Sequence, residues 1–303
     1  MRDSVNAATD SAPDAVGLVV VDKEPGWTSH DVVARCRRIF GLRRVGHAGT
    51  LDPDATGVLL VGLGRFTRML RFLSALGKSY TGEIVLGVAT STLDASGEVT
   101  GRWDMSGVDL SSVRAAAAGL TGDVRQRPPM VSAVKVGGQR LHVLARRGEE
   151  VERAERSVVV ERFEIEPTGE SGVFAVEVDC STGTYVRVLA ADLGTALGGG
   201  AHLRNLRRTR VGSFTVDDAA PLEALSLERL LAPAEALRHL PRVMVGEETA
   251  RSVSHGLPLD KVAAGASGTG PWAVLDGAGR LLAVYRHGDG DRMVAICVLE
   301  PSG

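Results

Sequence analysis

The sequence has few of the residues that mark secreted or membrane proteins. Only 3 of its 303 residues are cysteine, and Cys36, Cys180 and Cys297 lie far apart without a CxxC pair. This spacing argues against a zinc site and a disulfide framework, and it is typical of a protein in a reducing compartment. No uninterrupted apolar stretch is long enough to span a bilayer. We therefore expect a cytoplasmic protein without a metal centre and without a membrane contact.

Aromatic residues and net charge are also scarce. Aromatic residues make up 4 % of the chain, and the formal net charge of −2 does not by itself indicate a nucleic-acid partner. The charges are unevenly distributed, however, because eight arginines and only two acidic residues lie between Arg35 and Arg71. Acidic residues prevail between Asp217 and Glu248. A surface polarised in this way indicates a polyanionic partner, although the net charge alone does not.

Several motifs that bind cofactors or act as nucleophiles are missing. The sequence contains no GxxxxGK[ST] phosphate loop, no glycine fingerprint between a strand and a helix, and no GxSxG elbow. These absences give no indication of an organic cofactor, so we expect the protein to need none.

Strand and helix patterns alternate irregularly, which favours an α+β fold with a mixed, mostly antiparallel sheet flanked by helices and loops. A strand is expected over 17–22, followed by a helix from a capping box at Thr28 and Asp31 to Gly41. Apolar residues from Phe66 to Leu76 recur at helical spacing, and a strand with Tyr80 near its start follows. A further helix is expected to start at about residue 184, with Thr184 as its cap.

The chain is expected to divide into three parts. Residues 1–16 are polar and are predicted to be a disordered tail. Residues 17–237 are predicted to form the large domain. Residues 241–303 are predicted to form a small β-rich domain, in which "RVMVGEETARSVSHGLPL" forms short strands and Asp276 to Gly279 makes a hairpin turn.

The segment "VGHAGTLDPDATGVLLVGLG" places two carboxylates on a loop that glycines flank. Pro53 pushes the preceding residue, Asp52, out of the helical region, so Asp52 is held extended and could project into a cleft. The alternative interpretation is that Asp52 or Asp54 only caps the next turn.

Three other residues have both a functional and a structural interpretation. Arg187, in "STGTYVRVLAADLG", would keep a neighbouring carboxylate ionised by lowering its pKa, or it is a surface arginine. Tyr80 could stack on a flipped base, or it belongs to the core. His47 could contact a phosphate or a base, or it satisfies the loop backbone.

Basic residues also gather near these segments, and this clustering favours contacts between these residues and a phosphate backbone. The arginines assigned to such contacts are Arg43, Arg44, Arg65, Arg68, Arg204 and Arg207.

Several segments together carry a family resemblance. "GHAGTLDPDATGVLLVGLG", "GKSYTGEIVLG", "CSTGTYVRVLAADLG" and "GGGAHLRNLRRTRVGSF" resemble, in this order, motifs of the TruB type of tRNA pseudouridine synthase. The matching segments span about residues 17–214. The resemblance implies the pseudouridine synthase fold, and the C-terminal part resembles the small PUA-like RNA-binding domain of that family only loosely.

The resemblance also implies the roles of individual residues. Asp52 would be the essential catalytic aspartate, Arg187 would pair with it, and Tyr80 would stack on the target uracil and assist proton removal from C5. His47, Tyr185 and Leu206 would line the substrate pocket. The substrate would be uridine 55 in the T-loop of tRNA, so the T-arm would be the partner. No protein partner is implied, and a monomer is expected.

The predicted chemistry detaches uracil from C1′ of the ribose, turns it and rejoins it through C5, without a redox change. Asp52 could attack the sugar, attack the base or remove a ribose proton. Two rival functions remain: an RNA-binding or RNA-folding protein without activity, and a hydrolase that uses Asp52 and Asp54 as an acid–base or metal pair. The proline between these two residues, and the lack of a third partner, count against the hydrolase.

Overall fold

The structure is a computed structural model that describes residues 15–132 and 151–299, with a few positions between 135 and 149. The predicted tail at 1–16 therefore lies almost entirely outside the described residues. Among the helices that are described, none has the length and apolar character needed to cross a membrane.

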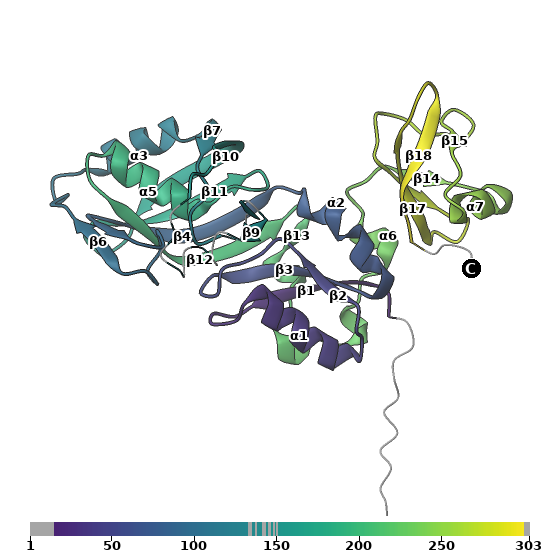
Figure 1. The fold of residues 1–303 in the computed structure, drawn as a ribbon, viewed down its shortest axis with the longest axis horizontal. Helices are drawn as coiled ribbons and strands as arrows, with labels where there is room; N and C mark the ends of the chain where they lie inside the picture. The colour runs from purple at the N-terminus through teal and green to yellow at the C-terminus, as the bar shows by residue number, and fades with distance from the viewer. Residues whose placement is uncertain are drawn as a thin grey trace, which may run out of the picture.

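A central sheet of nine strands organises the first part of the described chain (Figure 1). Seven of the strands lie side by side in the order β1-β3-β12-β4-β11-β10-β7, while β2 pairs with β3 and β13 pairs with β12. Their bounds are β1 Gly17–Lys23, β2 Val45–Ala48, β3 Thr56–Leu63, β4 Lys78–Leu86, β7 Gly122–Gln126, β10 Arg156–Pro167, β11 Val173–Cys180, β12 Ala201–Val211 and β13 Phe214–Thr215.

Only the contact between β12 and β3 is parallel, and the other pairings in this sheet are antiparallel. The predicted mixed, mostly antiparallel sheet is therefore confirmed. The parallel contact depends on Gly57, which has a φ of +99° and lies against the backbone of Arg208. A Cβ at this position would lie 2.1 Å from the Arg208 carbonyl oxygen, so only glycine allows the two strands to approach here.

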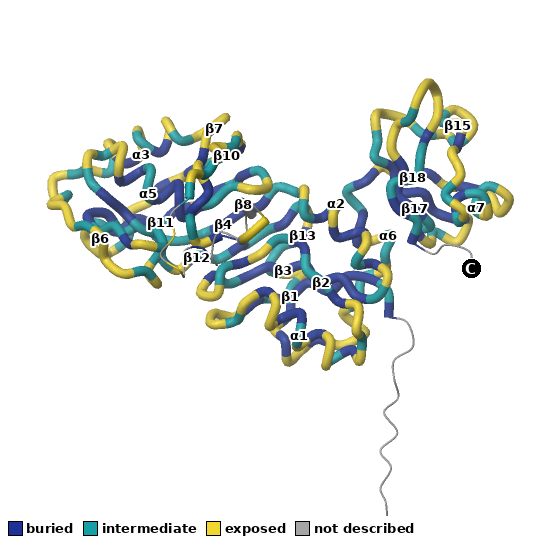
Figure 2. Tube along the Cα trace, viewed as in Figure 1, coloured by how far each residue is buried: buried dark blue, intermediate teal, exposed yellow. Residues whose placement is uncertain are grey.

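Three helices pack against this sheet through one apolar cluster, and Figure 2 shows the strands as its buried centre. The helices are α1 (Ser29–Phe40), α3 (Leu110–Gly119) and α5 (Val186–Ala196). The capping box of α1 is present as predicted, because Thr28 and Asp31 each accept a hydrogen bond from the other's backbone N–H. The helix ends at Gly41, whose left-handed conformation (φ +64°) a residue with a Cβ adopts only at a cost.

Two helix predictions need correction. The apolar spacing between Phe66 and Leu76 does not form one helix, because a 3-10 segment (η1, Gly64–Met69) precedes the short α2 (Leu70–Ser74). The helix expected at Thr184 begins at Val186, with Tyr185 at its N-cap position and no side-chain cap. The Thr184 hydroxyl instead donates to the Ser181 carbonyl at 3.0 Å, so it stabilises the preceding turn.

Several small elements complete the first part of the chain. Two short antiparallel pairs lie outside the main sheet, β5 (Val88–Thr90) with β6 (Val99–Arg102) and β8 (Lys135–Val136) with β9 (Gln139–Arg140). The 3-10 segments η2 (Val216–Asp218), η3 (Leu222–Ala224) and η4 (Leu227–Arg229) then lead to helix α6 (Pro233–Ala236).

The chain from residue 242 onward forms a second sheet, which stands apart from the first in Figure 1. Its order is β14-β16-β17-β18-β15, with bounds β14 Arg242–Met244, β15 Leu259–Asp260, β16 Trp272–Leu275, β17 Leu281–His287 and β18 Arg292–Val298. The predicted turn between Asp276 and Gly279 is present, with the Gly279 N–H donating to the Asp276 carbonyl at 2.9 Å.

One prediction for this region is wrong. Part of the segment expected to form only short strands is a helix, α7 (Glu247–Ser254), which packs on the sheet through the buried Val253. The second sheet also shares an apolar cluster with the first, in which Leu275 and Val284 join Leu18 and Phe66. The two sheets are therefore linked by buried apolar side chains and not by a linker alone.

Candidate active site

The loop between β2 and β3 carries Asp52, and side chains from three other elements hold this loop. Ser29, at the start of α1, accepts a hydrogen bond from the Leu51 N–H at 2.9 Å and donates to the Leu51 carbonyl at 3.1 Å. Lys23, at the end of β1, is fully buried, and its Nζ donates to the Pro53 carbonyl at 2.7 Å. The backbone on both sides of Asp52 is therefore fixed by hydrogen bonds from α1 and β1.

Arg208 holds the two ends of the same loop. This arginine of β12 is fully buried, and its Nη2 donates to the Gly49 carbonyl at 3.1 Å while its Nε donates to the Val58 carbonyl at 2.7 Å. A buried guanidinium with such partners avoids the cost of an unsatisfied charge. Arg208 therefore ties β12 to the start and the end of the Asp52 loop.

Asp52 forms an ion pair with Arg187, the arginine in the first turn of α5. The Arg187 Nε lies 3.0 Å from Asp52 Oδ2, and the Arg187 side chain is only 4 % exposed. Arg187 also donates to the Thr92 and Val131 carbonyls at 2.8 Å and 3.1 Å, and its Nη1 lies 3.4 Å from Asp94 Oδ2. Each nitrogen of this guanidinium therefore has a partner, which holds it in one place under Asp52.

Arg187 lowers the pKa of Asp52, as predicted, but the effect of burial on this pKa is larger and was not predicted. Burial raises the pKa of the Asp52 carboxyl above its ordinary value of 3.8, and the neighbouring Asp94 adds to the rise. Arg187 and Lys23 act in the opposite direction. The Asp52 side chain is still 41 % exposed, so water also favours the ionised form. The arginine therefore limits the increase in the Asp52 pKa, and it does not lower the pKa below its ordinary value.

The neighbouring carboxylate, Asp54, has a different environment. Asp54 is exposed and lies beyond Pro53 on the same loop. Across the residues that the structure describes, no ion pair to Asp54 is found. In the same part of the chain, no group of three or more His, Cys, Asp or Glu side chains is arranged to hold a metal ion. The geometry distinguishes Asp52, which is paired, from Asp54, which is exposed and lines only the larger of the two pockets beside Asp52.

Two adjoining pockets open beside Asp52, and Asp52, Arg187 and Leu206 line both of them. One has a volume of about 230 Å³ and includes Tyr80 and Tyr185. The other has a volume of about 320 Å³ and includes Thr92, Asp94 and Asn205. The structure thus brings together Asp52, Arg187, Tyr80, Tyr185 and Leu206, which the sequence places in four separate segments.

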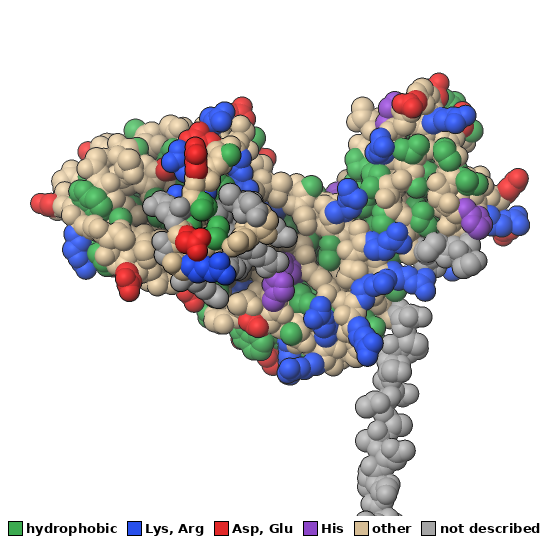
Figure 3. Space-filling model, viewed as in Figure 1, with side chains coloured by type: hydrophobic (Ala, Val, Ile, Leu, Met, Phe, Trp, Pro, Cys, Tyr) green, Lys and Arg blue, Asp and Glu red, His purple; other side chains and the backbone are tan. Residues whose placement is uncertain are grey.

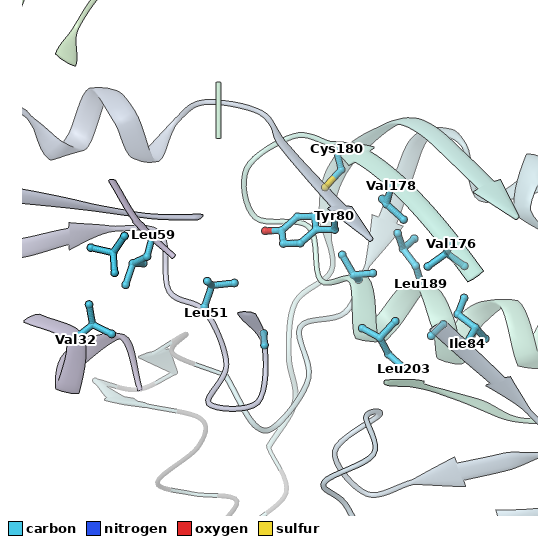
Figure 4. Close-up of a cluster of buried hydrophobic side chains, with 14 of the residues drawn as sticks. Val32, Leu51, Leu59, Tyr80, Ile84, Val176, Val178, Cys180, Leu189 and Leu203 are labelled. Carbon is cyan, nitrogen blue, oxygen red and sulfur yellow. The ribbon is translucent and has the colours of Figure 1, made fainter. Parts of the chain in front are cut away.

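Tyr80 is almost buried, and its ring packs into the apolar cluster that includes Val178 and Cys180. Figure 4 shows its hydroxyl turned away from Val178 and Leu189, toward the side on which Leu51 lies. Burial raises the pKa of the Tyr80 phenol, so it is neutral near pH 7. Tyr80 therefore belongs to the core and to the pocket wall at the same time, and the two interpretations of this residue are compatible.

His47 lies apart from the lining of both pockets. It is in β2, where its ring packs edge-on against His30 with the centroids 5.4 Å apart. Burial, His30 and Arg208 lower the pKa of His47 to about 4, so the imidazole is neutral near pH 7. The structure therefore does not bring His47 to the pocket wall, and a neutral ring cannot provide an ionic contact to phosphate.

The arginines assigned to RNA contacts fall into two groups. Arg43, Arg44, Arg65 and Arg68 are exposed, and Figure 3 shows basic side chains gathered over α1, α2 and the adjacent base of the second sheet. Arg68 also donates to the Val298 carbonyl at 2.8 Å, which links η1 to the second sheet.

Arg204 and Arg207 differ from that group, because each guanidinium already forms an ion pair with a carboxylate. Arg204 Nε donates to Glu83 at 2.6 Å, and Arg207 donates to both oxygens of Asp22 at 2.8 Å and 2.9 Å. Their geometry supports a structural role within the sheet more than a contact to a phosphate backbone.

Four residues of the site were not predicted as site residues from the sequence. Lys23, Ser29 and Arg208 fix the Asp52 loop, and Asp94 shares Arg187 with Asp52. In the sequence, the only indication of a role for Lys23 was its position directly after the expected apolar strand. Nothing local marked Asp94, because its role depends on an arginine that is distant in the sequence.

Comparisons with known proteins indicate the family of the chain. The model of the TruB family pseudouridylate synthase (N terminal domain) matches residues 37–186, and that of the tRNA pseudouridylate synthase B C-terminal domain matches residues 187–250. The tRNA pseudouridine synthase B of Rhodococcus jostii is 48 % identical over 293 residues, which cover 94 % of each chain. That of Corynebacterium aurimucosum is 49 % identical over 292 residues, covering 94 % of this chain and 97 % of its own.

Solved structures show the same likeness. The structure of a Cbf5-Nop10-Gar1 complex has a chain that matches with a TM-score of 0.72 and 27 % identity, covering 94 % of this chain and 85 % of its own. An archaeal box H/ACA sRNP Nop10-Cbf5 complex matches with a TM-score of 0.68 and 25 % identity, covering 94 % and 86 %. The family models, the curated relatives and the fold agree, and the chain belongs to the TruB family of pseudouridine synthases.

Proposed function

We propose that this protein converts uridine 55 in the T-loop of tRNA to pseudouridine, with Asp52 as the essential catalytic residue. The single observation that carries the proposal is the ion pair between Asp52 and the buried Arg187, beside a pocket that Tyr80 lines. The name of the curated relatives, tRNA pseudouridine synthase B, supports tRNA as the substrate.

The reaction needs a carboxylate and a closely fitting pocket but no redox partner. The N1–C1′ bond breaks, a C5–C1′ bond forms, a proton leaves C5 and N1 gains one, so atoms and electrons balance within the nucleotide. The Asp52 carboxylate attacks the sugar, attacks the base or removes a ribose proton, and each role requires the ionised form. Arg187 favours that form at a site where burial opposes it.

The target base must leave its stack before it reaches Asp52. The pocket of about 230 Å³ beside Tyr80 and Leu206 is narrow and partly apolar, which suits a flipped uracil. Tyr80 would stack on the base and assist removal of the C5 proton. Because its pKa is raised, the neutral phenol would accept that proton only together with a further group, or would direct it by hydrogen bonding.

The rest of the T-arm would lie along exposed arginines. We assign the backbone contacts to Arg43, Arg44 and Arg65, which are exposed. The second sheet, within residues 241–303, would act as a PUA-like RNA-binding domain next to them. Such contacts fix the register of the RNA and leave selection of the uridine to the pocket.

The test is an Asp52→Asn variant, assayed by chemical mapping of pseudouridine in a tRNA transcript. We expect turnover to fall below detection while tRNA binding remains within a few-fold of wild type. The matched control is Asp54→Asn, which removes an exposed carboxylate two residues away, in the lining of the larger pocket and without an ion pair among the described residues, and should leave turnover within a few-fold of wild type. A transcript with cytidine at position 55 should remain unmodified elsewhere in the T-loop.

The two rival functions give different results. A protein that only binds or folds RNA would form no pseudouridine even in the wild-type form. A hydrolase that uses both carboxylates would lose its hydrolytic activity equally in Asp52→Asn and Asp54→Asn. Wild-type turnover by Asp52→Asn would refute the proposed catalytic role.

A further inference from the structure

A second arginine, Arg156, lies in the pocket that contains Tyr80, and part of its guanidinium has no partner. Arg156 is the first residue of β10, and its guanidinium carbon lies 4.6 Å from the ring centroid of Tyr185. Its Nε and Nη2 are both buried, and neither has a hydrogen-bond partner among the residues that the structure describes. Buried donors of a charged group are costly to leave unpaired, so this arrangement needs an explanation.

The other cations of this pocket are already occupied. Lys78 Nζ donates to the Leu76 carbonyl at 2.7 Å, Arg208 binds the Asp52 loop and Arg187 binds Asp52 itself. Within the described part of the pocket lining, Arg156 is therefore the cation that still has an unpaired hydrogen-bonding edge.

The position of Arg156 is fixed from two sides. Its backbone pairs with that of Gln126 on β7. The buried Gln126 side chain accepts a hydrogen bond from the Tyr185 N–H at 3.0 Å and donates to the Tyr185 carbonyl at 3.2 Å. The backbone of Tyr185, which carries the ring under the guanidinium, is therefore anchored, and the stacked arginine loses little further freedom when it binds a ligand.

The unpaired Nε–Nη2 edge of Arg156 has a defined shape. In a guanidinium group, the Nε–H and one Nη2–H are parallel and form a fork that matches two oxygens of one anion. The Nη1 end is turned to Gly183, where an added Cβ would lie 3.8 Å from it. An RNA ligand carries such a pair of oxygens at every phosphodiester.

We propose that Arg156 binds the two non-bridging oxygens of a phosphodiester adjoining the flipped uridine, with Tyr185 as its stacking platform. This inference rests on the proposed function, because it takes RNA as the ligand. Arg156 would hold the backbone of the target nucleotide while Asp52 acts on its glycosidic bond. It would thereby fix the depth to which the base enters the pocket.

The protein test compares Arg156→Gln and Arg156→Lys with Arg114→Gln. Arg114 is a matched control, because it is exposed on α3 and forms an ion pair with Glu166 at 2.6 Å. For Arg156→Gln we expect KM for a T-arm stem-loop to rise about tenfold, with a much smaller change in kcat. The slope of log binding constant against log salt concentration should fall by about 0.7–0.9, the value for one lost phosphate contact. Arg156→Lys should keep most of the salt slope but lose affinity, because lysine lacks the fork.

The substrate test replaces one phosphodiester at a time, 5′ or 3′ of the target uridine, with a neutral methylphosphonate. At one of these positions the replacement should weaken wild-type binding as much as Arg156→Gln does, and it should add nothing further in that variant. Full additivity at both positions, or an unchanged KM and salt slope in Arg156→Gln, would overturn the inference. If wild-type protein forms no pseudouridine in tRNA, the proposed function fails instead.

Discussion

Replacement of Arg187 by methionine tests the physical basis of the site most directly. The side chain is 4 % exposed, and its Nε and Nη1 lie 3.0 Å and 3.4 Å from the carboxylates of Asp52 and Asp94. Loss of one partner of a buried ion pair costs about 3–5 kcal/mol in the free energy of unfolding. We expect the lower end of this range, because the Asp52 side chain is 41 % exposed and water compensates part of the loss.

The same substitution should change the pH dependence of activity. Burial already raises the pKa of Asp52, and Arg187 opposes that rise. Without the arginine, the pKa should rise further. Because catalysis needs the ionised carboxylate, the acid limb of the kcat profile should move to higher pH by the same amount. Activity near pH 7 should therefore fall, and part of it should return toward pH 9.

Two measurements check this expectation. Urea unfolding at pH 7 and pH 4 gives the stability term, and the difference from wild type should shrink at pH 4, where protonation neutralises the uncompensated carboxylates. Single-turnover rates between pH 5 and pH 9 give the position of the acid limb. Arg187→Lys keeps the charge but loses two of the donors. Its stability and the pH of its acid limb should lie between those of Arg187→Met and of wild type. An acid limb that stays in place in both variants would refute the electrostatic role of Arg187.

Two further substitutions test other parts of the same network. Asp94→Asn removes the like charge that raises the pKa of Asp52, so the acid limb of kcat should move to lower pH, as a pH–rate profile would show. A limb that moves upward would contradict this sign. Gly57→Ala should lower the free energy of unfolding by more than about 1–2 kcal/mol, because φ is +99° and the Cβ would lie 2.1 Å from the Arg208 carbonyl oxygen. Gly119→Ala is the control in the same urea experiment, since a Cβ there meets no atom within 4 Å, and an equal loss in both variants would show that the contact with Arg208 is not responsible.

Local sequence patterns predicted the elements whose stability is local. The α1 helix has both a capping box at Thr28 and a left-handed glycine at its end, and both were visible in the sequence. Helix α7 was missed, because Glu247–Ser254 has few apolar residues and makes its one deep contact, through Val253, with a sheet formed later in the chain. The start of α5 was placed too early for a different, local reason: the Thr184 hydroxyl donates to the preceding turn and does not cap the helix.

For the site, the sequence by itself determined which residue types are present and where residues that restrict the backbone lie in the Asp52 loop. Glycines and Pro53 restrict the backbone locally, and the order of motifs carried the family resemblance. The resemblance implied that Arg187 pairs with Asp52, but only the tertiary structure gave the distance between them and showed that Asp54 is exposed. The tertiary structure also added the burial that raises the pKa of Asp52, against which Arg187 acts in the predicted direction. The reason is that burial and distances between distant residues control electrostatics, and neither quantity follows from spacing along the chain.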